Sequence, residues 1–306
     1  MTVGRSLPFH KTSAFSAQFK SIKTTKLPPR LELCSAICAP SKVFVMTKTR
    51  MIAAAISLLL YAQLLCGYML EAQVTVRQME GLVHGFLTLS SLDGKILADG
   101  EQTQVARGDQ VTMHLILRFK DGSIHEETTV FSQRHIFRLI SSHLKQTGPA
   151  FKQTIETSVI ATSGQVSAHF TDGDGKEKTI TGHLQMPVDV ANGMVPKLIK
   201  NLPSKIPRTR ISIVTTIPKV RIVKIDISPV GKDSFSMGGF SSRDATHYIV
   251  KANIGGIAGL LAPLAGKQPQ ETHVWVLEGE APVFFRSEGP LYQGGPVWRI
   301  ELTSPH

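Results

Sequence analysis

Apolar and polar positions alternate along the chain from residue 81 onward, with the two-residue period of a β-strand. Residues 111–119 show the pattern clearly, because Val, Met, Leu, Leu and Phe occupy every second position. Residues 211–217 and 220–227 are similar and rich in β-branched residues, and residues 246–252, 273–277 and 297–302 add further candidates. These runs predict a chain built mainly of strands.

Tight-turn signals separate the predicted strands. Asp-Gly or Gly-Gly pairs occur within residues 92–95, 120–123, 172–175 and 293–296. Such pairs supply the positive φ angles that hairpin turns require. The spacing between runs is short and helical crossovers are scarce, so the predicted sheet is antiparallel.

Two stretches interrupt the strand pattern. Residues 189–202 are typical of a short helix, with Pro196 near its first turn, and residues 252–266 are uncharged and rich in Gly, Ala and Leu. The second stretch predicts either a small helix or a buried crossing strand. A long antiparallel sheet must close or curl to protect its edges, as an up-and-down barrel or as an incomplete barrel around a helix. The predicted fold class is mainly β: an antiparallel sheet curled into an open or half barrel with one or two short helices.

Residues 46–72 have the three parts of a secretory signal peptide. Lys48 and Arg50 form a basic flank, residues 51–70 carry no charge, and the small Ala72 precedes Gln73. The apolar run is also long enough to cross a bilayer as a helix, so an uncleaved membrane anchor is the alternative. This segment predicts a periplasmic or secreted protein. The alternative is a protein attached to the membrane through this segment only.

The upstream residues 1–45 carry seven basic residues against one acid among many Ser and Thr. They predict a disordered segment or a mis-assigned start, with translation beginning at Met46 or Met51. Residues 73–306 then form a single β domain. All three cysteines precede Gln73, so that domain has no disulfide and no thiolate metal site. It carries 25 basic and 21 acidic residues and no long basic run, which argues against nucleic acid as a partner.

Two segments carry a resemblance, residues 266–269 (Gly-Lys-Gln-Pro) and residues 289–301, which include Gly-Pro-Leu-Tyr-Gln-Gly-Gly-Pro. With these segments the domain resembles uncharacterised exported proteins of the bacterial envelope, to which no activity is assigned. In architecture alone it also resembles, more loosely, the half-barrels of lipoprotein carriers.

No metal or cofactor site is predicted. The histidines form no HxH or HxxxH pair, and the run His125-Glu126-Glu127 lacks the second histidine of a zinc-protease helix, since residue 129 is Thr. No cysteine and no Gly-x-Ser-x-Gly elbow is available for nucleophilic catalysis. A hydrolase using Asp244 and His247, with His273, is one hypothesis, motivated only by the presence of acid–base residues.

The last third of the chain suggests a binding surface. It holds both tryptophans among proline and glycine, and the candidate ligand-binding residues are Trp275, Phe284, Trp298, Leu260 and Leu264. An ordinary β core is the alternative for these side chains. The function predicted is an exported envelope protein that binds a lipid, another hydrophobic ligand or an envelope partner within a curled sheet. A structural or interaction protein without a small-molecule site is the alternative, and no catalytic residue or cofactor is expected.

Overall fold

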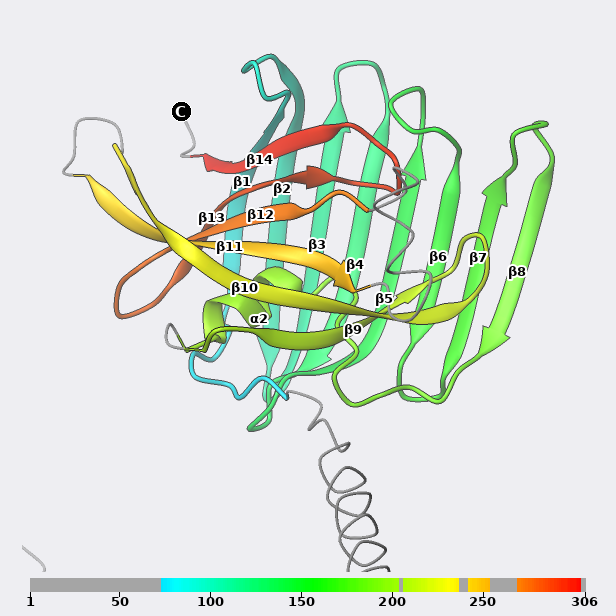
Figure 1. Cartoon of the computed structure of the whole chain (residues 1–306). Helices are drawn as coiled ribbons and strands as arrows, with labels where there is room; N and C mark the ends of the chain where they lie inside the picture. Colours follow the sequence, from blue (N-terminus) through cyan, green and yellow to red (C-terminus); the bar gives the residue numbers. More distant parts are fainter. Residues whose placement is uncertain (1–72, 204–205, 237–241, 254–268, 304–306) are drawn as a thin grey trace, which may run out of the picture. The chain divides into compact units, whose positions relative to one another are not determined.

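A single antiparallel sheet dominates the structure, which is a computed structural model describing residues 73–203, 206–236, 242–253 and 269–303 (Figure 1). The described residues form fourteen strands and one short helix. The first eight strands are β1 (Val83–Ser90), β2 (Ile96–Arg107), β3 (Gln110–Phe119), β4 (Ile124–Ser132), β5 (Arg138–Thr147), β6 (Ile155–Ile160), β7 (Gln165–Thr171) and β8 (Glu177–His183). After the helix α2 (Val195–Asn201) come β9 (Thr209–Thr215), β10 (Arg221–Phe235), β11 (Arg243–Asn253), β12 (Thr272–Leu277), β13 (Val283–Pro290) and β14 (Val297–Thr303).

The sheet consists of two meanders joined through their end strands. Its strand order is β8-β7-β6-β5-β4-β3-β2-β1-β14-β13-β12-β11-β10-β9. The first and last strands of the domain pair antiparallel, with Phe86 opposite Thr303 and Ser90 opposite Arg299. The two edge strands, β8 and β9, are not paired with each other among the described strands, so the sheet is not closed into a barrel. This arrangement confirms the predicted curled antiparallel sheet.

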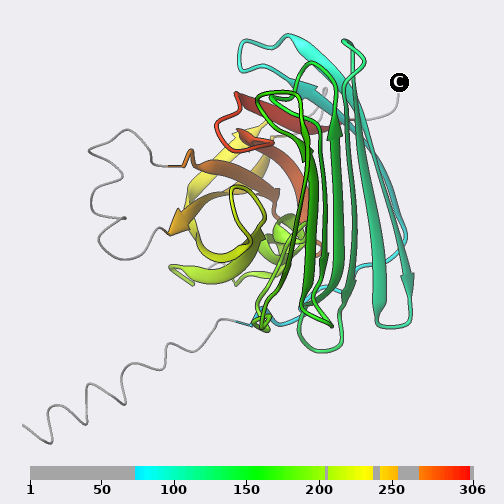
Figure 2. The same ribbon diagram turned by 90° about the vertical axis from the view of Figure 1, so that its right-hand side faces the viewer.

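The sheet curls so that its second half lies over its first half. Strands β9–β14 cross in front of β1–β8 in Figure 1, and Figure 2 shows β1–β8 as one layer with the yellow to red strands against one side of it. At the far end, the turn between β9 and β10 reaches β8, because a methyl group added at Gly182 would lie 3.2 Å from Cβ of Val220. The edges of the sheet therefore approach each other without forming a ladder.

The main core lies between these two halves. It unites Phe131 of β4 and Val159 of β6 with Ile211 of β9, Ile227 of β10 and Val274 of β12. Because side chains alternate along a strand, every second residue of these strands points to the interior. The apolar positions of the alternating sequence pattern therefore form the core.

Helix α2 is shorter than the sequence suggested. The prediction covered residues 189–202, whereas the helix begins at Val195 with Pro196 in its first turn. The preceding residues follow the edge strand β9 instead: Val190 forms a parallel bridge with Ser212, and the Asn192 side chain bonds both backbone groups of Val214. Those tertiary hydrogen bonds replace the helical ones, so the prediction of a helix was wrong for residues 189–194.

Other local predictions were correct. The predicted turns at residues 92–95 and 172–175 lie between β1 and β2 and between β7 and β8, with φ of +93° at Gly94 and +78° at Gly175. Strand β3 covers the run predicted at residues 111–119, and the His125-Glu126-Glu127 run belongs to β4. Of the second interrupted stretch, residues 252 and 253 end β11, and the remainder lies outside the described residues.

Candidate functional site

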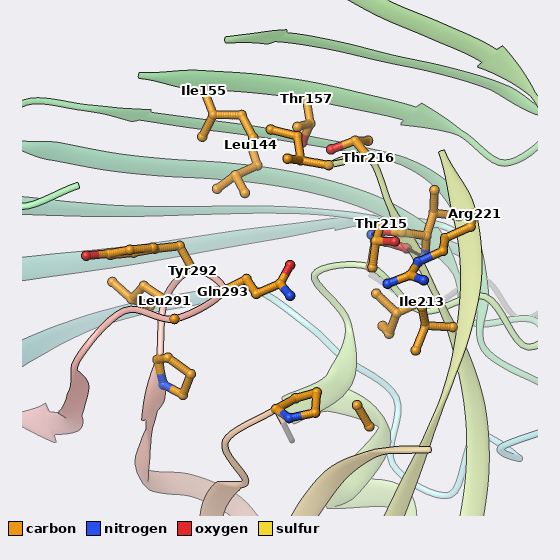
Figure 3. A pocket seen from close by; sticks show the side chains of 18 of the residues that line it. Leu144, Ile155, Thr157, Ile213, Thr215, Thr216, Arg221, Leu291, Tyr292 and Gln293 are labelled. Carbon is orange, nitrogen blue, oxygen red and sulfur yellow. Dashed lines mark hydrogen bonds between the residues drawn. The ribbon is translucent and has the colours of Figure 1, made fainter. Parts of the chain in front are cut away.

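A cavity of about 1550 Å³ lies between the two halves of the sheet (Figure 3). One wall comes from β5 and β6 through Leu144, Ile155 and Thr157. The opposite wall comes from β9 and β10, and the segment after β13 forms a third side. Most of the lining surface is apolar. Elements that are far apart in the sequence therefore meet around this cavity.

The strand register explains why these side chains share the cavity. Leu144 pairs with Thr157 across β5 and β6, and Ile213 pairs with Val223 across β9 and β10. Residues that are directly opposite in an antiparallel pair lie on the same face of the sheet. Each wall is therefore a continuation of the apolar face that forms the core nearby.

The segment after β13 is held in place by the layer opposite it. Gln146 Nε2 donates a hydrogen bond of 3.0 Å to the Leu291 carbonyl oxygen. The Tyr292 ring meets Phe151 edge-on at 5.8 Å between centroids and Trp298 at 6.2 Å. Figure 3 shows Leu291, Tyr292 and Gln293 together on one side of the open space. This third side is thus packed against aromatic rings.

A buried polar group lies beside the cavity on the inner face of β4. His125 is 4% exposed, and Gln146 Nε2 lies 3.0 Å from its Nδ1. Burial lowers the pKa of His125 to about 4, so the ring is neutral at pH 7. Burial also raises the pKa of Glu127, two residues further on, to about 7.

The neighbouring Thr129 is fully buried, and its hydroxyl has no hydrogen-bond partner among the described residues. A side chain added at Gly193 would collide with this hydroxyl and would come within 2.8 Å of Glu127 Oε1. The backbone at Gly193 therefore covers Glu127 and Thr129 closely. Residues 125–129 combine titratable side chains with tight packing, which makes this part of the interior sensitive to pH.

The candidate ligand-binding residues lie elsewhere in the structure. Trp275 packs against Leu277 in a small separate cluster and donates a 2.6 Å hydrogen bond from Nε1 to Asp233. Trp298 packs with Phe119, Phe151 and Tyr292. Phe284 packs against the main core. None of the three candidates is among the described residues that line the cavity. Leu260 and Leu264 fall outside the described residues, and a ligand-binding role for the five stays a prediction.

The acid–base trio of the hydrolase hypothesis is only partly assembled. His247 Nε2 lies 2.9 Å from His273 Nδ1, and the His247 ring stacks on Trp275 at 4.3 Å between centroids. Burial, followed by the neighbouring His273, lowers the pKa of His247. Asp244 is three positions from His247 on a regularly paired strand, so its side chain points to the opposite face, where it accepts a hydrogen bond from Ser234. The structure does not bring Asp244 to the two imidazoles; the carboxylate beside them is that of Asp233, whose Oδ2 lies 3.6 Å from His247 Nδ1.

The described residues show neither a metal site nor a membrane-spanning helix. Across the described ranges, no group of three or more His, Cys, Asp or Glu side chains is arranged to hold a metal ion. In the same ranges, no helix has the length and apolar character needed to cross a membrane. Residues 1–72, which contain the proposed signal peptide, lie outside the described residues.

The residues that line the cavity were not singled out from the sequence. Ile155, Thr157, Ile213 and Val223 lie in strand-like runs whose alternation looks the same whether the inner face is packed or open. One signal was available, since the segment 289–301 that carries the resemblance to envelope proteins includes Leu291 and Tyr292. That signal gave no indication of a cavity.

Comparisons with known proteins find little that is similar to this chain. No protein-family model matches it, and no curated protein does. Among solved structures, the chain is similar to a β-barrel-like protein of the domain of unknown function DUF1849 from Brucella abortus. That likeness covers 74% of this chain and 98% of the other, with 9% identity and a TM-score of 0.38. These comparisons assign no function to the chain.

Proposed function

We propose that this protein binds a hydrophobic ligand, such as a lipid, in the cavity between the two halves of its curled sheet. The observation that supports this most directly is a mainly apolar cavity of about 1550 Å³. Ligand pockets typically measure about 300–1,000 Å³ and are lined predominantly by apolar and aromatic side chains. This cavity is large enough for a molecule with a long hydrocarbon chain.

The driving force is the removal of hydrocarbon from water. Each buried methylene contributes about 0.8 kcal/mol, so ten methylenes contribute about 8 kcal/mol before the cost of ordering the ligand. The side chains of Leu144, Ile155, Ile213 and Leu291 face the space that such a chain would occupy (Figure 3). An apolar ligand would cover these walls without leaving a carboxylate of the lining unpaired, since the described lining residues include no Asp or Glu.

We further propose that the protein works outside the cytoplasm, in the periplasm or after secretion. The support comes from the sequence of residues 46–72, with its basic flank, uncharged apolar run and small residue before Gln73. Such a location would bring the protein to envelope lipids and to envelope proteins, either of which is a suitable partner for an exported lipid-binding domain.

Native mass spectrometry of the full-length protein after gentle extraction tests the binding function. We expect a co-purified apolar molecule, or binding of a fluorescent lipid after delipidation. Ile155→Trp places a bulky ring in the cavity and should weaken that binding at least about tenfold, because it occupies ligand space. Ile160→Trp is the matched control, since Ile160 lies five positions along the same strand on its opposite face.

A protein that is empty after extraction and binds no lipid probe would instead favour an interaction protein without a small-molecule site. Equal binding by the two tryptophan variants would place the ligand outside this cavity. Thermal unfolding of both variants would confirm that they remain folded.

A further inference from the structure

The charged side chains among the described residues that line the cavity are all basic. Its described lining residues include the basic side chains of Lys152, Arg210, Arg221 and Lys224, and no acidic side chain. A cleft lined by one sign of charge and by apolar walls attracts ligands of the opposite sign. The described lining of the cavity therefore combines apolar walls with basic side chains and contains no acidic one.

Two of these cations are held by acids of the protein. Arg210 Nε donates to Asp226 Oδ1 at 2.7 Å, and Lys224 Nζ lies 3.2 Å from Asp189 Oδ2. The pKa of Asp226 lies below its usual value, because hydrogen bonds and the charge of Arg210 outweigh its partial burial. The charge of each of these two cations is therefore balanced by a carboxylate of the protein itself.

Arg221 differs from these two. Among the described residues its side chain has no ion pair and no hydrogen bond, and that side chain is exposed. It begins β10 directly opposite Thr215 of β9, on the same face as Ile213 and Val223. Figure 3 shows its guanidinium group beside Thr215, pointing toward the open space. Arg221 thus lies at the water-facing end of an apolar wall.

Thr215 provides an independent observation at the same point. Its Oγ1 is buried and has no hydrogen-bond partner among the described residues. An unsatisfied buried hydroxyl is unfavourable, and native structures generally provide it with a partner. Because Thr215 faces the cavity beside Arg221, a ligand oxygen at this position could accept a hydrogen bond from the hydroxyl. The pair therefore offers both charge and a hydrogen-bond donor to one anionic group.

We propose that the ligand is an anionic amphiphile, whose carboxylate or phosphate head group binds Arg221 and Thr215 while its hydrocarbon chain enters the cavity. This inference rests on the proposed function, because it names the chemical class of the ligand of that same cavity. The planar guanidinium can donate two parallel hydrogen bonds to either kind of oxyanion. The exposed position of Arg221 lets the head group remain partly in water while the chain is buried.

Binding measurements on the delipidated full-length protein test this assignment. The probes are oleate, oleoyl lysophosphatidate, the neutral oleyl alcohol of the same chain length, and inorganic phosphate. We expect the wild-type protein to bind at least one of the two anionic amphiphiles about tenfold or more tightly than oleyl alcohol, as charge-assisted hydrogen bonds are strong. Which of the two binds more tightly distinguishes a carboxylate from a phosphate head group.

The decisive variant is Arg221→Gln. It should weaken binding of the preferred anionic amphiphile about tenfold or more and leave oleyl alcohol within about twofold, because only the charged contact is lost. Thr215→Val, which removes the hydroxyl at nearly constant volume, should weaken the same probe to a smaller extent. Arg107→Gln is the matched control, since Arg107 is also exposed, lies on β2 and is not among the described residues that line the cavity.

Other outcomes separate the two proposals. If oleyl alcohol binds the wild-type protein as tightly as oleate and lysophosphatidate, or if Arg221→Gln changes no probe, the anionic assignment is overturned while the hydrophobic cavity stands. If inorganic phosphate alone binds as tightly as the amphiphiles, the ligand is a free anion and the assignment is also overturned. If no probe binds, the proposed function itself fails.

Discussion

The pH dependence of the free energy of unfolding tests whether His125 and Glu127 are buried on the inner face of β4. Burial raises the pKa of Glu127 from 4.5 to about 7 and lowers the pKa of His125 from 6.5 to about 4. Both groups are thus neutral in the folded protein over a pH range in which one or both of them would be charged in the unfolded chain. The two perturbations proposed are Glu127→Gln and His125→Gln.

The sign of each contribution follows from proton linkage. A folded-state pKa above the unfolded value gives stability that is present below pH 4.5 and is lost as the pH rises to about 7, which applies to Glu127. A depressed histidine pKa has the opposite effect, so the contribution of His125 is present above pH 6.5 and is lost as the pH falls to about 4. Between pH 4.5 and 6.5 the two contributions therefore change in opposite directions.

The magnitudes are similar. A pKa difference of one corresponds to 1.36 kcal/mol, so each group contributes a change of about 3 kcal/mol at most. For Glu127 this is an upper limit, because its side chain keeps some accessible surface and water would reduce the effect. Relative to the wild-type protein, Glu127→Gln should gain stability progressively from pH 4.5 to 7 and then level off. His125→Gln should gain stability, relative to the wild-type protein, as the pH falls from 6.5 to about 4.

The assay is urea unfolding between pH 4 and 8 at constant ionic strength, followed by tryptophan fluorescence. Glu126→Gln is the control, because Glu126 is the next residue on β4, lies on the opposite face and pairs with His114 at 2.8 Å. It should change the pH dependence by about 0.5 kcal/mol or less, as expected for an exposed pair. A stability difference between Glu127→Gln and wild type that is flat from pH 4.5 to 7 would refute the reasoning for this carboxyl group.

Three other predictions concern packing, backbone conformation and processing. Phe131→Ala removes a fully buried ring from the main core and should cost about 3–5 kcal/mol of unfolding free energy in urea titrations. Gly193→Ala, at φ +71° and against the Thr129 hydroxyl, should cost more than Gly175→Ala, at φ +78° with open space around it; equal melting temperatures would contradict the packing described. Expressed in a Gram-negative host with its proposed signal peptide, the protein should give an N-terminal sequence beginning near Gln73, and retention of the apolar run would show an uncleaved anchor.

The amino-acid sequence by itself determined the class of fold. Alternation with a period of two specifies strands, and the Asp-Gly pairs at residues 93–94 and 121–122 specify where hairpins turn, because both signals act between near neighbours. Pro196 marked the first turn of the helix for the same reason. The sequence alone did not show which residues surround the histidine of the hydrolase hypothesis: His247 lies beside His273, whereas Asp244 bonds Ser234.

Only the tertiary structure decided which apolar faces meet and where they leave a cavity. The pairing of β1 with β14 joins the two ends of the domain, and it brings β5 and β6 opposite β9 and β10. Residues 189–194 are not helical, because they form hydrogen bonds with β9 instead. The pKa of Glu127 is raised because the curled sheet buries this carboxyl group. Contacts of this kind depend on residues far apart in the chain, so a periodic pattern identifies an inner face without showing whether that face is packed or open.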